Sequence, residues 1–487
     1  MRREAGGLSG MGSRARAALL AVAALAASAL AGMLGQGWAS RLGLLLGGGV
    51  GLVLLLQAPG LGLVALAALS LTLPLTIGTG SEVSLTPPVL LIPAITAVWL
   101  VDGLRRRSLE VPHPPTTLPL VLFVASGLVS LLAGQSYWDP LVPRSGNLLL
   151  VQLAQVALFA LSAAIFLVAK DLGRRGPWLR LATWAFLAMG ALTALPWLVP
   201  RLWRVVFWVD EANSGLLWSW LGALAAGQLL FNRRLGRGAK AGLLVLLLAA
   251  GYVVFVRRRE WLSGWVPYTV AVAAVAWLWV WRRRRAVGLL ALVAMVALAT
   301  VLFPAIYEYA GGDFEWGVSG GGRMLLYERT LELVEDHPIL GLGPAAYRHY
   351  GFTRWLSLGA GRALYLDPRI SSHNNYIDVY AQMGLVGLAL FAWFLAALGW
   401  AGWGLRTRFD GDFEDGYVHG ALGGLAGTLV AMMLVDWFLP FVYNVGFPGF
   451  RMSALAWMFL GGLVALEKVA RDRAMKGGES EAEKVGA

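Results

Sequence analysis

Long apolar stretches separated by short polar breaks run through most of this 487-residue chain. An apolar stretch of about 18 or more residues is long enough to cross a bilayer as a helix. The pattern predicts fourteen such segments, near residues 17–35, 42–56, 60–77, 85–104, 117–134, 148–169, 178–199, 214–231, 240–256, 261–281, 286–305, 375–402, 419–440 and 451–467. The second segment is short, so we expect an all-α integral membrane protein with about 12–14 transmembrane helices.

One polar stretch is much longer than the others and separates two sets of predicted spans. With the charged tail, the chain therefore has four regions. N-terminal spans, a long loop, C-terminal spans and a charged tail are expected at residues 1–305, 306–374, 375–467 and 468–487. Within the loop, the glycine run 317–322 resists regular structure. Apolar residues then recur at helical spacing over residues 323–336, which predicts an amphipathic helix with Arg323 and Tyr327 on one face. The tail is expected to fray.

The basic residues predict an orientation. The chain is 58% hydrophobic and 14% charged, with a formal net charge of +12. With the N-terminus inside, the segments expected inside carry most of the 40 Lys and Arg residues, as the positive-inside rule requires. We therefore expect both termini in the cytoplasm and the long loop outside. The net charge reflects this topology and contact with membrane lipids, and no nucleic-acid partner is expected.

Several other readings of the sequence are disfavoured. The basic N-terminus resembles a signal peptide, but the many spans after it favour a first helix that stays attached. The chain has no Cys, and its five His residues lack metal-ligand spacing. Asp410-Gly411-Asp412 lies on the expected inner side and is interpreted as a polar turn. We expect neither a metal nor a cofactor.

Three consecutive arginines lie at the expected outer end of the 240–256 segment, where the positive-inside rule predicts few basic residues. They are Arg257, Arg258 and Arg259. They could anchor the helix end at the interface, with Glu260 as an ionic partner. They could instead bind a diphosphate, because a guanidinium group matches phosphate oxygens two at a time.

His373 stands where the long loop meets the next apolar segment. Ser371 or Ser372 can cap the helix that is expected to begin near Asn374. A helix N-terminus disfavours positive charge and so favours a neutral imidazole, which can accept a proton. The alternative is a histidine that only hydrogen-bonds its own loop.

Asp436 is a carboxylate inside the apolar segment 419–440, towards its expected outer end. An ionisable group within a membrane span is a functional hypothesis by default, and this one could orient a sugar or an arginine. A buried aspartate that only accepts hydrogen bonds is the alternative.

Four short motifs follow one another in the loop and the segment after it. They are Gly322-Arg323 with Tyr327, the run from His337 to Pro344, His373-Asn374-Asn375-Tyr376, and the run from Gly384 to Leu388. In order and spacing they resemble the signature region of the O-antigen ligase and polymerase superfamily. The likeness covers residues 320–400 and extends more loosely over 210–440. It implies a C-type (GT-C) membrane glycosyltransferase fold.

The resemblance also implies substrates and roles. The donor would be a glycan on undecaprenyl diphosphate at the outer leaflet of a bacterial inner membrane, and the acceptor a hydroxyl on a lipid- or sugar-linked partner. His373 would be the catalytic base, with Arg258 and Arg323 on the diphosphate. The family has a serine where this chain has Arg257, so Arg257 and Arg259 compete for the role of Arg258. The expected supporting residues are Tyr327, Asn374, Tyr376 and Asp436.

Three kinds of enzyme share these motifs and differ in their acceptors. A ligase moves a finished polymer to a lipid core, a polymerase joins repeat units, and a protein O-oligosaccharyltransferase modifies protein side chains. A lipid-linked oligosaccharide transporter would instead need polar groups near mid-membrane in several spans. Here the polar groups gather at the expected outer face, which favours an enzyme at that face over a transporter. The resemblance implies ligase-like transfer, in which the arginines would replace a divalent metal.

Overall fold

A computed structural model describes residues 49, 51–81, 83–105, 115–204, 212–309, 312, 322–357 and 371–485. Its elements are α3 (Leu61–Thr72), β1 (Ile77–Gly78), β2 (Ser84–Leu85), α4 (Pro87–Arg105), α5 (Thr117–Ser136), α6 (Leu148–Leu172), α7 (Trp178–Leu198), η1 (Pro200–Arg204), α8 (Gly215–Phe231), α9 (Arg237–Tyr252), η3 (Val253–Arg257), α10 (Leu262–Arg283), α11 (Arg285–Tyr309), α13 (Gly322–Val334), α14 (Tyr347–Ser357), α15 (Asn375–Leu405), α16 (Phe413–Leu434) and α17 (Gly446–Val485). The predicted segment 17–35, most of 42–56 and most of the glycine run lie outside the described residues.

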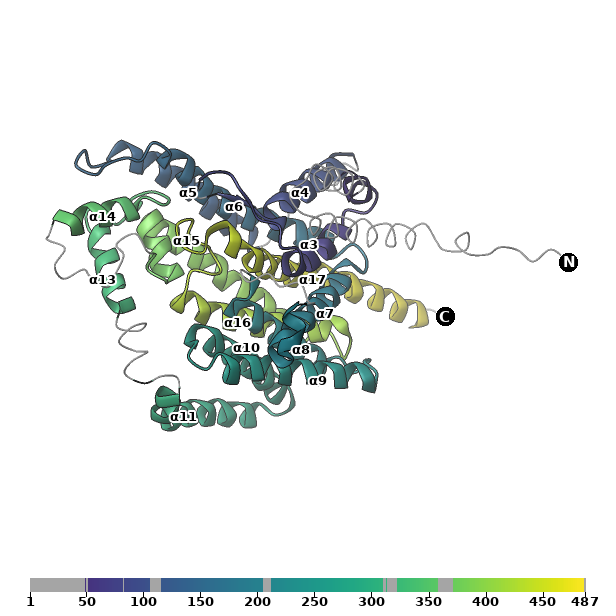
Figure 1. Cartoon of the computed structure of the whole chain (residues 1–487). Helices are drawn as coiled ribbons and strands as arrows, with labels where there is room; N and C mark the ends of the chain where they lie inside the picture. Colours follow the sequence, from purple (N-terminus) through teal and green to yellow (C-terminus); the bar gives the residue numbers. More distant parts are fainter. Residues whose placement is uncertain are drawn as a thin grey trace.

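Apolar helices account for most of the described residues. Among the described residues, ten helices are long and apolar enough to cross a membrane, while α3 and α8 are apolar but shorter. They fall on the predicted segments from residue 60 onward, so the all-α integral membrane architecture is confirmed. The helices run roughly side by side, with α13 and α14 at one end and the C-terminal end of α17 at the other (Figure 1). The predicted loop helix is present as α13, but Met324 and Leu331 on its expected apolar face are exposed.

Helices α8, α10 and α16 pack closely in the bundle. Small residues allow this packing: a Cβ atom on Gly227 of α8 would lie 2.3 Å from the carbonyl oxygen of Gly416 in α16. Close backbone approach through small residues is typical of membrane helices. In contrast, α11 lies at the edge of the bundle, where Gly288 is its one buried residue (Figure 1).

The boundaries of α16 differ from the prediction. This helix begins at Phe413, because the side chain of Asp412 caps it by accepting a hydrogen bond from the Asp415 N–H (3.0 Å). It ends at Leu434 and not near residue 440, and residues 435–445 are not helical. Pro440 opposes a helix that continues through residue 440, because it has no N–H to donate and it disfavours a helical residue before it.

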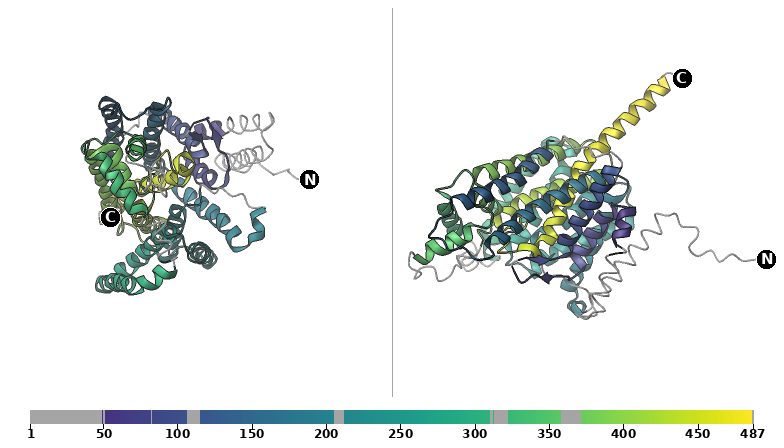
Figure 2. Two further views of the ribbon diagram at one scale, coloured as in Figure 1. Left: turned by 60° about the vertical axis from the view of Figure 1, so that its left-hand side comes forward. Right: turned by 90° about the horizontal axis from the view of Figure 1, so that it is seen from above.

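Two other helices also differ in length. The first, α3, ends at Thr72 and not near residue 77, because Pro74 disfavours a helical residue before it. The last, α17, continues to Val485, so the prediction of a frayed tail is wrong. The tail is rich in Ala, Glu, Lys and Arg, which favour helix, and α17 projects beyond the bundle (Figure 2).

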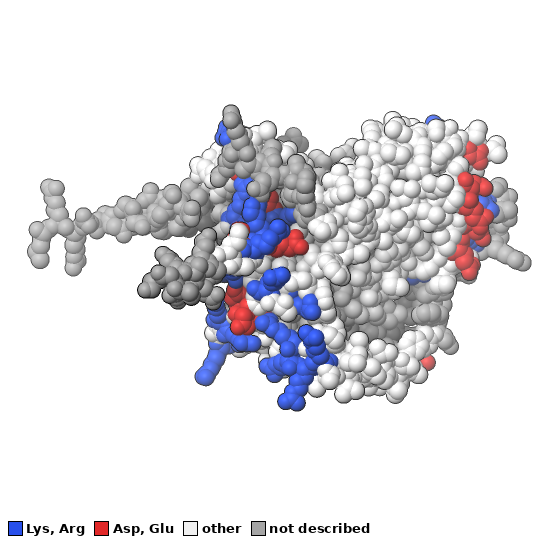
Figure 3. Space-filling view, turned by 180° about the vertical axis from the view of Figure 1, so that it is seen from behind, with Lys and Arg blue, Asp and Glu red and all other residues white. Residues whose placement is uncertain are grey.

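Charged side chains gather at the two ends of the molecule. On the face shown in Figure 3, Lys and Arg dominate one end, Asp and Glu form a patch at the other, and a broad uncharged band separates them. The two ends of α15 and α16 serve below as reference points. We call the end with residues 371–374 and 435–445 the His373 end, and the end with residues 406–415 the Asp415 end.

Candidate functional site

His373 lies two residues before the start of α15 and has a left-handed backbone conformation. Its φ is 53°, a conformation that costs on the order of 1–3 kcal/mol for a non-glycine residue and clusters at active sites. The His373 N–H donates to Ser371 Oγ (3.0 Å), which helps to hold this turn. The imidazole is 28% exposed, so the site stays open to a substrate.

The cap of α15 is Asn374. Its side-chain oxygen accepts hydrogen bonds from the N–H groups of Tyr376 and Ile377 (3.0 and 3.3 Å). The predicted serine cap is therefore wrong. Ser372 instead donates to Asp378 (2.8 Å) inside the bundle.

The side chain of Asn444 joins His373 to Asp436. Its amide nitrogen lies 2.7 Å from Asp436 Oδ1, 3.2 Å from Ser371 Oγ and 3.3 Å from His373 Nδ1. His373 Nδ1 and Asp436 Oδ1 are 3.8 Å apart, so a protonated imidazole would form an ion pair with the carboxylate. Asn444 was missed in the sequence, where its one signal is a polar side chain between two apolar segments.

Asp436 is fully buried although it lies outside any helix. The prediction that it lies within a span is wrong, because α16 ends two residues earlier. Its carboxylate accepts hydrogen bonds from the Phe441 N–H (3.2 Å) and from Asn444. Asn375 fixes this segment by donating to the Leu439 carbonyl (2.7 Å). Burial raises the pKa of Asp436 to about 6, because a buried carboxylate loses its hydration.

His373 is neutral at pH 7. Burial, and then the positive charge of Arg323, lower its pKa to about 4. The neutral form was expected from the helix N-terminus, but burial and Arg323 are the causes here. The same interaction brings Arg323 of α13 into the electrostatic surroundings of His373.

The carbonyl group of Met433, near the end of α16, receives two hydrogen bonds. The Tyr327 hydroxyl of α13 donates to it (3.0 Å), and so does the Asn374 side chain (3.2 Å). One turn earlier, the Leu429 carbonyl accepts from the Tyr376 hydroxyl (3.0 Å). These three side chains therefore hold α13 and α15 against α16, which positions Arg323 and His373.

Helix α15 is interrupted at Gly384, where residues 338–343 cross it. Gly384 has a φ of 62°, and a Cβ atom there would lie 2.2 Å from the Ile339 carbonyl oxygen. Backbone hydrogen bonds of 2.8–3.2 Å join residues 338–343 to residues 381–386 on both sides of the break. Two of the motifs behind the family resemblance therefore bind each other and fix the loop to α15.

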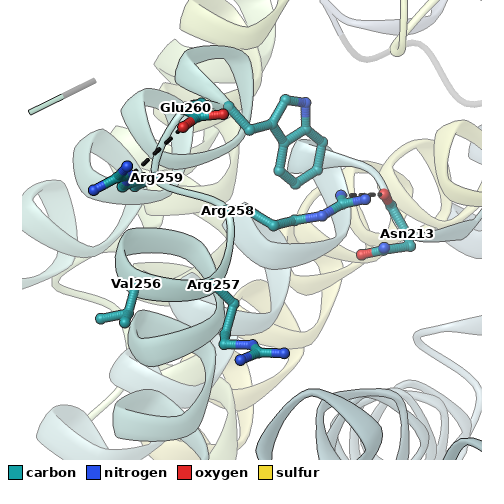
Figure 4. A pocket seen from close by; sticks show the side chains of 7 residues that line it. Asn213, Val256, Arg257, Arg258, Arg259 and Glu260 are labelled. Carbon is teal, nitrogen blue, oxygen red and sulfur yellow. Dashed lines mark hydrogen bonds and ion pairs between the residues drawn. The ribbon is translucent and has the colours of Figure 1, made fainter. Parts of the chain in front are cut away.

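The three consecutive arginines line a cavity of about 570 Å³ together with Asn213 and Trp261. Arg258 points into the bundle, with its guanidinium carbon 4.9 Å from the ring centre of Trp197 and 4.3 Å from that of Trp261. It also donates to the Asn213 carbonyl (3.5 Å; Figure 4). Arg257 and Arg259 are exposed and point in other directions, the latter towards Glu260 (3.6 Å; Figure 4).

Two tryptophans connect this cavity to the histidine. The rings of Trp261 and Trp437 meet edge to face, with centres 5.5 Å apart, and Trp437 follows Asp436 in the chain. A continuous path of contacts therefore runs from Arg258 through Trp261 and Trp437 to Asp436 and His373. Trp437 was not among the predicted site residues.

The acidic turn 410–412 lies at the Asp415 end, away from His373, and behaves as the polar turn that was predicted. Within the described ranges, no group of three or more His, Asp or Glu side chains is arranged to hold a metal ion.

Residues 235–392 match a sequence family described as O-antigen ligase. The matched range contains the three arginines, Arg323, Tyr327 and residues 373–376, and it ends before Asp436 and Asn444. The predicted resemblance to the O-antigen ligase superfamily is thus confirmed over this part of the chain. No curated protein sequence matches the chain significantly.

Proposed function

Because residues 235–392 match the O-antigen ligases, we propose that this membrane protein transfers a glycan from undecaprenyl diphosphate to a sugar hydroxyl. The observation that carries the proposal is a neutral, half-buried His373 joined through Asn444 to the buried Asp436. Arg258 and Arg323 supply positive charge of the kind that binds a diphosphate.

In this proposal His373 is the general base. The acceptor oxygen attacks the anomeric carbon and passes its proton to the imidazole. A carbon–oxygen bond to the acceptor forms as the bond to the diphosphate oxygen breaks, and undecaprenyl diphosphate leaves with the electron pair. One displacement of this kind inverts the anomeric centre. The imidazolium would be stabilised by Asp436, 3.8 Å away.

The charge of Arg323 links donor binding to base strength. With a pKa of about 4, His373 is a weak base in the unoccupied site. A bound diphosphate would offset the charge of Arg323 and so raise the pKa of His373. The imidazole would therefore become a stronger base when the donor is in place.

Arg258 is the best-placed arginine for the leaving group. Its guanidinium is held between two indole rings and faces the cavity, whereas Arg257 and Arg259 are exposed. A hydrogen-bond donor that is already positioned where negative charge develops lowers the activation barrier by about 2.7–4 kcal/mol. Arg323 would add to this charge from α13.

The distribution of charge supports a site at the outer leaflet. The Asp415 end includes Arg233, Arg234 and the run Arg282–Arg285, as expected for a cytoplasmic face. The site lies at the other ends of α15 and α16. We infer that it faces outward from a bacterial inner membrane, with both termini inside.

Mass spectrometry of undecaprenyl-linked glycans tests this function. Cells would carry the wild-type chain, no chain, or His373→Ala at matched protein level. We expect long lipid-linked polymers to accumulate in both defective strains if the chain is a ligase. Accumulation of single repeat units would assign it as a polymerase, and a missing protein-linked glycan as a protein O-oligosaccharyltransferase. Glycans that are unchanged, or that accumulate only on the inner leaflet, would contradict the proposal and favour a transporter.

A further inference from the structure

A second buried carboxylate, Asp378, lies at the His373 end, in the first turn of α15. Its Oδ1 atom accepts three hydrogen bonds. They come from the Tyr347 hydroxyl (2.7 Å), the Ser372 hydroxyl (2.8 Å) and the Ser372 N–H (3.3 Å). All three residues are buried. Since a buried polar group is costly unless it is hydrogen-bonded, these residues fix one another's positions.

The hydrogen bonds of Asp378 support the strained turn that carries His373. A left-handed backbone at a non-glycine residue persists only where the surroundings hold it. The residues on both sides of His373 are held in this way. Ser372 is bound to Asp378, and its Oγ accepts from the Asn374 N–H (3.2 Å). The side chain of Asn374 in turn is bound to α15 and α16.

Tyr347 connects Asp378 to the segment 435–445. Its ring stacks on that of Phe441, with ring centres 4.8 Å apart and an angle of 19° between the planes. The N–H of Phe441 donates to Asp436 (3.2 Å). Tyr347 is the first residue of α14, so the long loop contributes a side chain to the contacts that join the two buried carboxylates.

We propose that Asp378 is a positioning residue for His373 and acts through Ser372, with Tyr347 as a second hydrogen-bond partner. This inference rests on the proposed glycosyl transfer, in which His373 is the base. The accepting oxygen of Asp378 would hold the turn so that the imidazole stays partly buried beside Asn444. The alternative is that Asp378 stabilises the fold alone.

An NMR titration of His373 tests this role without requiring transfer. The full chain would carry ¹³C-labelled histidine in nanodiscs, and the signal of His373 among the five histidines would be assigned by its loss in His373→Ala. In the wild type it should titrate near pH 4, because burial and the charge of Arg323 lower the His373 pKa. In Asp378→Ala the turn should relax and the imidazole gain water, so its pKa should rise towards the ordinary 6.5.

The direction of this shift separates position from charge. Removal of a negative charge near an imidazole would lower its pKa. A rise in Asp378→Ala therefore reports a displaced imidazole, since the other charged groups near it, Arg323 and Asp436, are unchanged. Asp378→Asn keeps the Oδ1 atom that accepts all three hydrogen bonds, so its His373 pKa should not rise.

Asp415→Ala is the matched control. Asp415 is also a buried carboxylate in the first turn of a helix, α16, at the other end of the bundle. Its loss should lower thermal stability and leave the His373 pKa unchanged. Ser372→Ala serves if Asp378→Ala does not fold, and should raise the His373 pKa by a smaller amount. An unchanged or lowered His373 pKa in the Asp378 and Ser372 variants overturns the proposal, and so does an equal rise in Asp415→Ala.

Transfer kinetics connect the position of His373 to the reaction. Asp378→Ala should lower kcat about 10–10²-fold, because a displaced base costs rate. The KM for the lipid-linked donor should stay unchanged, since the Arg258 cavity is intact, and Asp378→Asn should restore most of the rate. A raised KM with an unchanged kcat would assign Asp378 to donor binding and overturn its positioning role. The proposed function is tested separately: it fails if the wild-type chain consumes no lipid-linked donor, whatever the His373 signal does.

Discussion

The two ends of the bundle hold their buried carboxylates in different ways. At the Asp415 end, Arg282 pairs with Asp415 at 2.7 Å, and Arg473 pairs with Asp412 at 2.6 Å. At the His373 end, Arg258 lies between two indole rings and Arg348 lies over the ring of Tyr443.

An arginine that is paired with a buried carboxylate stabilises the fold, as Arg282 and Arg473 do. An ion pair neutralises both partners and fixes a turn, as Asp415 does beside the cap of α16. An aromatic ring positions a guanidinium without cancelling its charge. The buried carboxylate Asp436, at the His373 end, is held by the neutral donors Asn444 and the Phe441 N–H.

The largest test of this comparison replaces one histidine at each end of the bundle by alanine. His373→Ala should lower the transfer rate about 10²–10⁴-fold, because it removes the base. His419 stacks on Phe231 at the Asp415 end (3.6 Å between ring centres), and His419→Ala should lower only thermal stability. Initial rates per folded protein in proteoliposomes would show this. Equal losses in the two variants would remove the functional distinction between the ends.

Neighbouring arginines provide the next test. Arg258→Gln should lower the transfer rate about 10²–10³-fold, since the leaving diphosphate loses a positioned hydrogen-bond donor. Arg257→Gln removes the same charge one residue earlier, from an exposed side chain, and should change the rate little. Single-turnover rates with saturating donor would compare them. A larger effect at Arg257 would reassign the diphosphate contact.

The pH dependence of kcat/KM tests Arg323. A general base is active when unprotonated, so activity should fall as pH drops through about 4, the pKa of His373 in the free protein. Arg323→Gln removes one cause of the low pKa, and the acid limb should move to higher pH. Arg323→Lys keeps the charge and should leave the limb in place, although it loses paired hydrogen bonds and some rate. An acid limb that is identical in wild type and Arg323→Gln would contradict the coupling.

The smallest effect on transfer is expected at the Asp415 end. Arg282→Gln leaves the buried Asp415 without its arginine partner and should destabilise the fold by about 1–3 kcal/mol. The transfer rate of the folded fraction should stay unchanged. Thermal unfolding in detergent, followed by rates at matched folded protein, would measure both. A rate loss without loss of stability would show that this end also serves the reaction.

Hydropathy predicted the helices because lipid requires long apolar segments with satisfied backbones. It did not predict where they end, since ends depend on single residues such as Asp412, which caps α16, and Pro440, which disfavours its continuation. The error at α16 mattered most, because it placed Asp436 inside a helix.

Charge and motifs picked out His373, Arg258, Arg323 and Asp436, and the structure connects them, although their roles stay predictions. Asn444, Trp437 and Tyr443 carried no comparable signal. These three residues reach the site because residues 435–445 are not helical and contact elements that are distant in the chain. Such contacts depend on tertiary packing, which the spacing of residues along one segment does not encode.

The position of residues 435–445 in the chain also bears on the biogenesis of the protein. Synthesis proceeds from the N-terminus, so His373 and α15 leave the ribosome before Asp436 and Asn444. A nascent chain whose α16 has not yet crossed the membrane contains His373. It lacks Asp436 and Asn444, the groups that hold this histidine. The site is therefore assembled only at the end of membrane insertion, and truncated products should be unable to act on lipid-linked sugars.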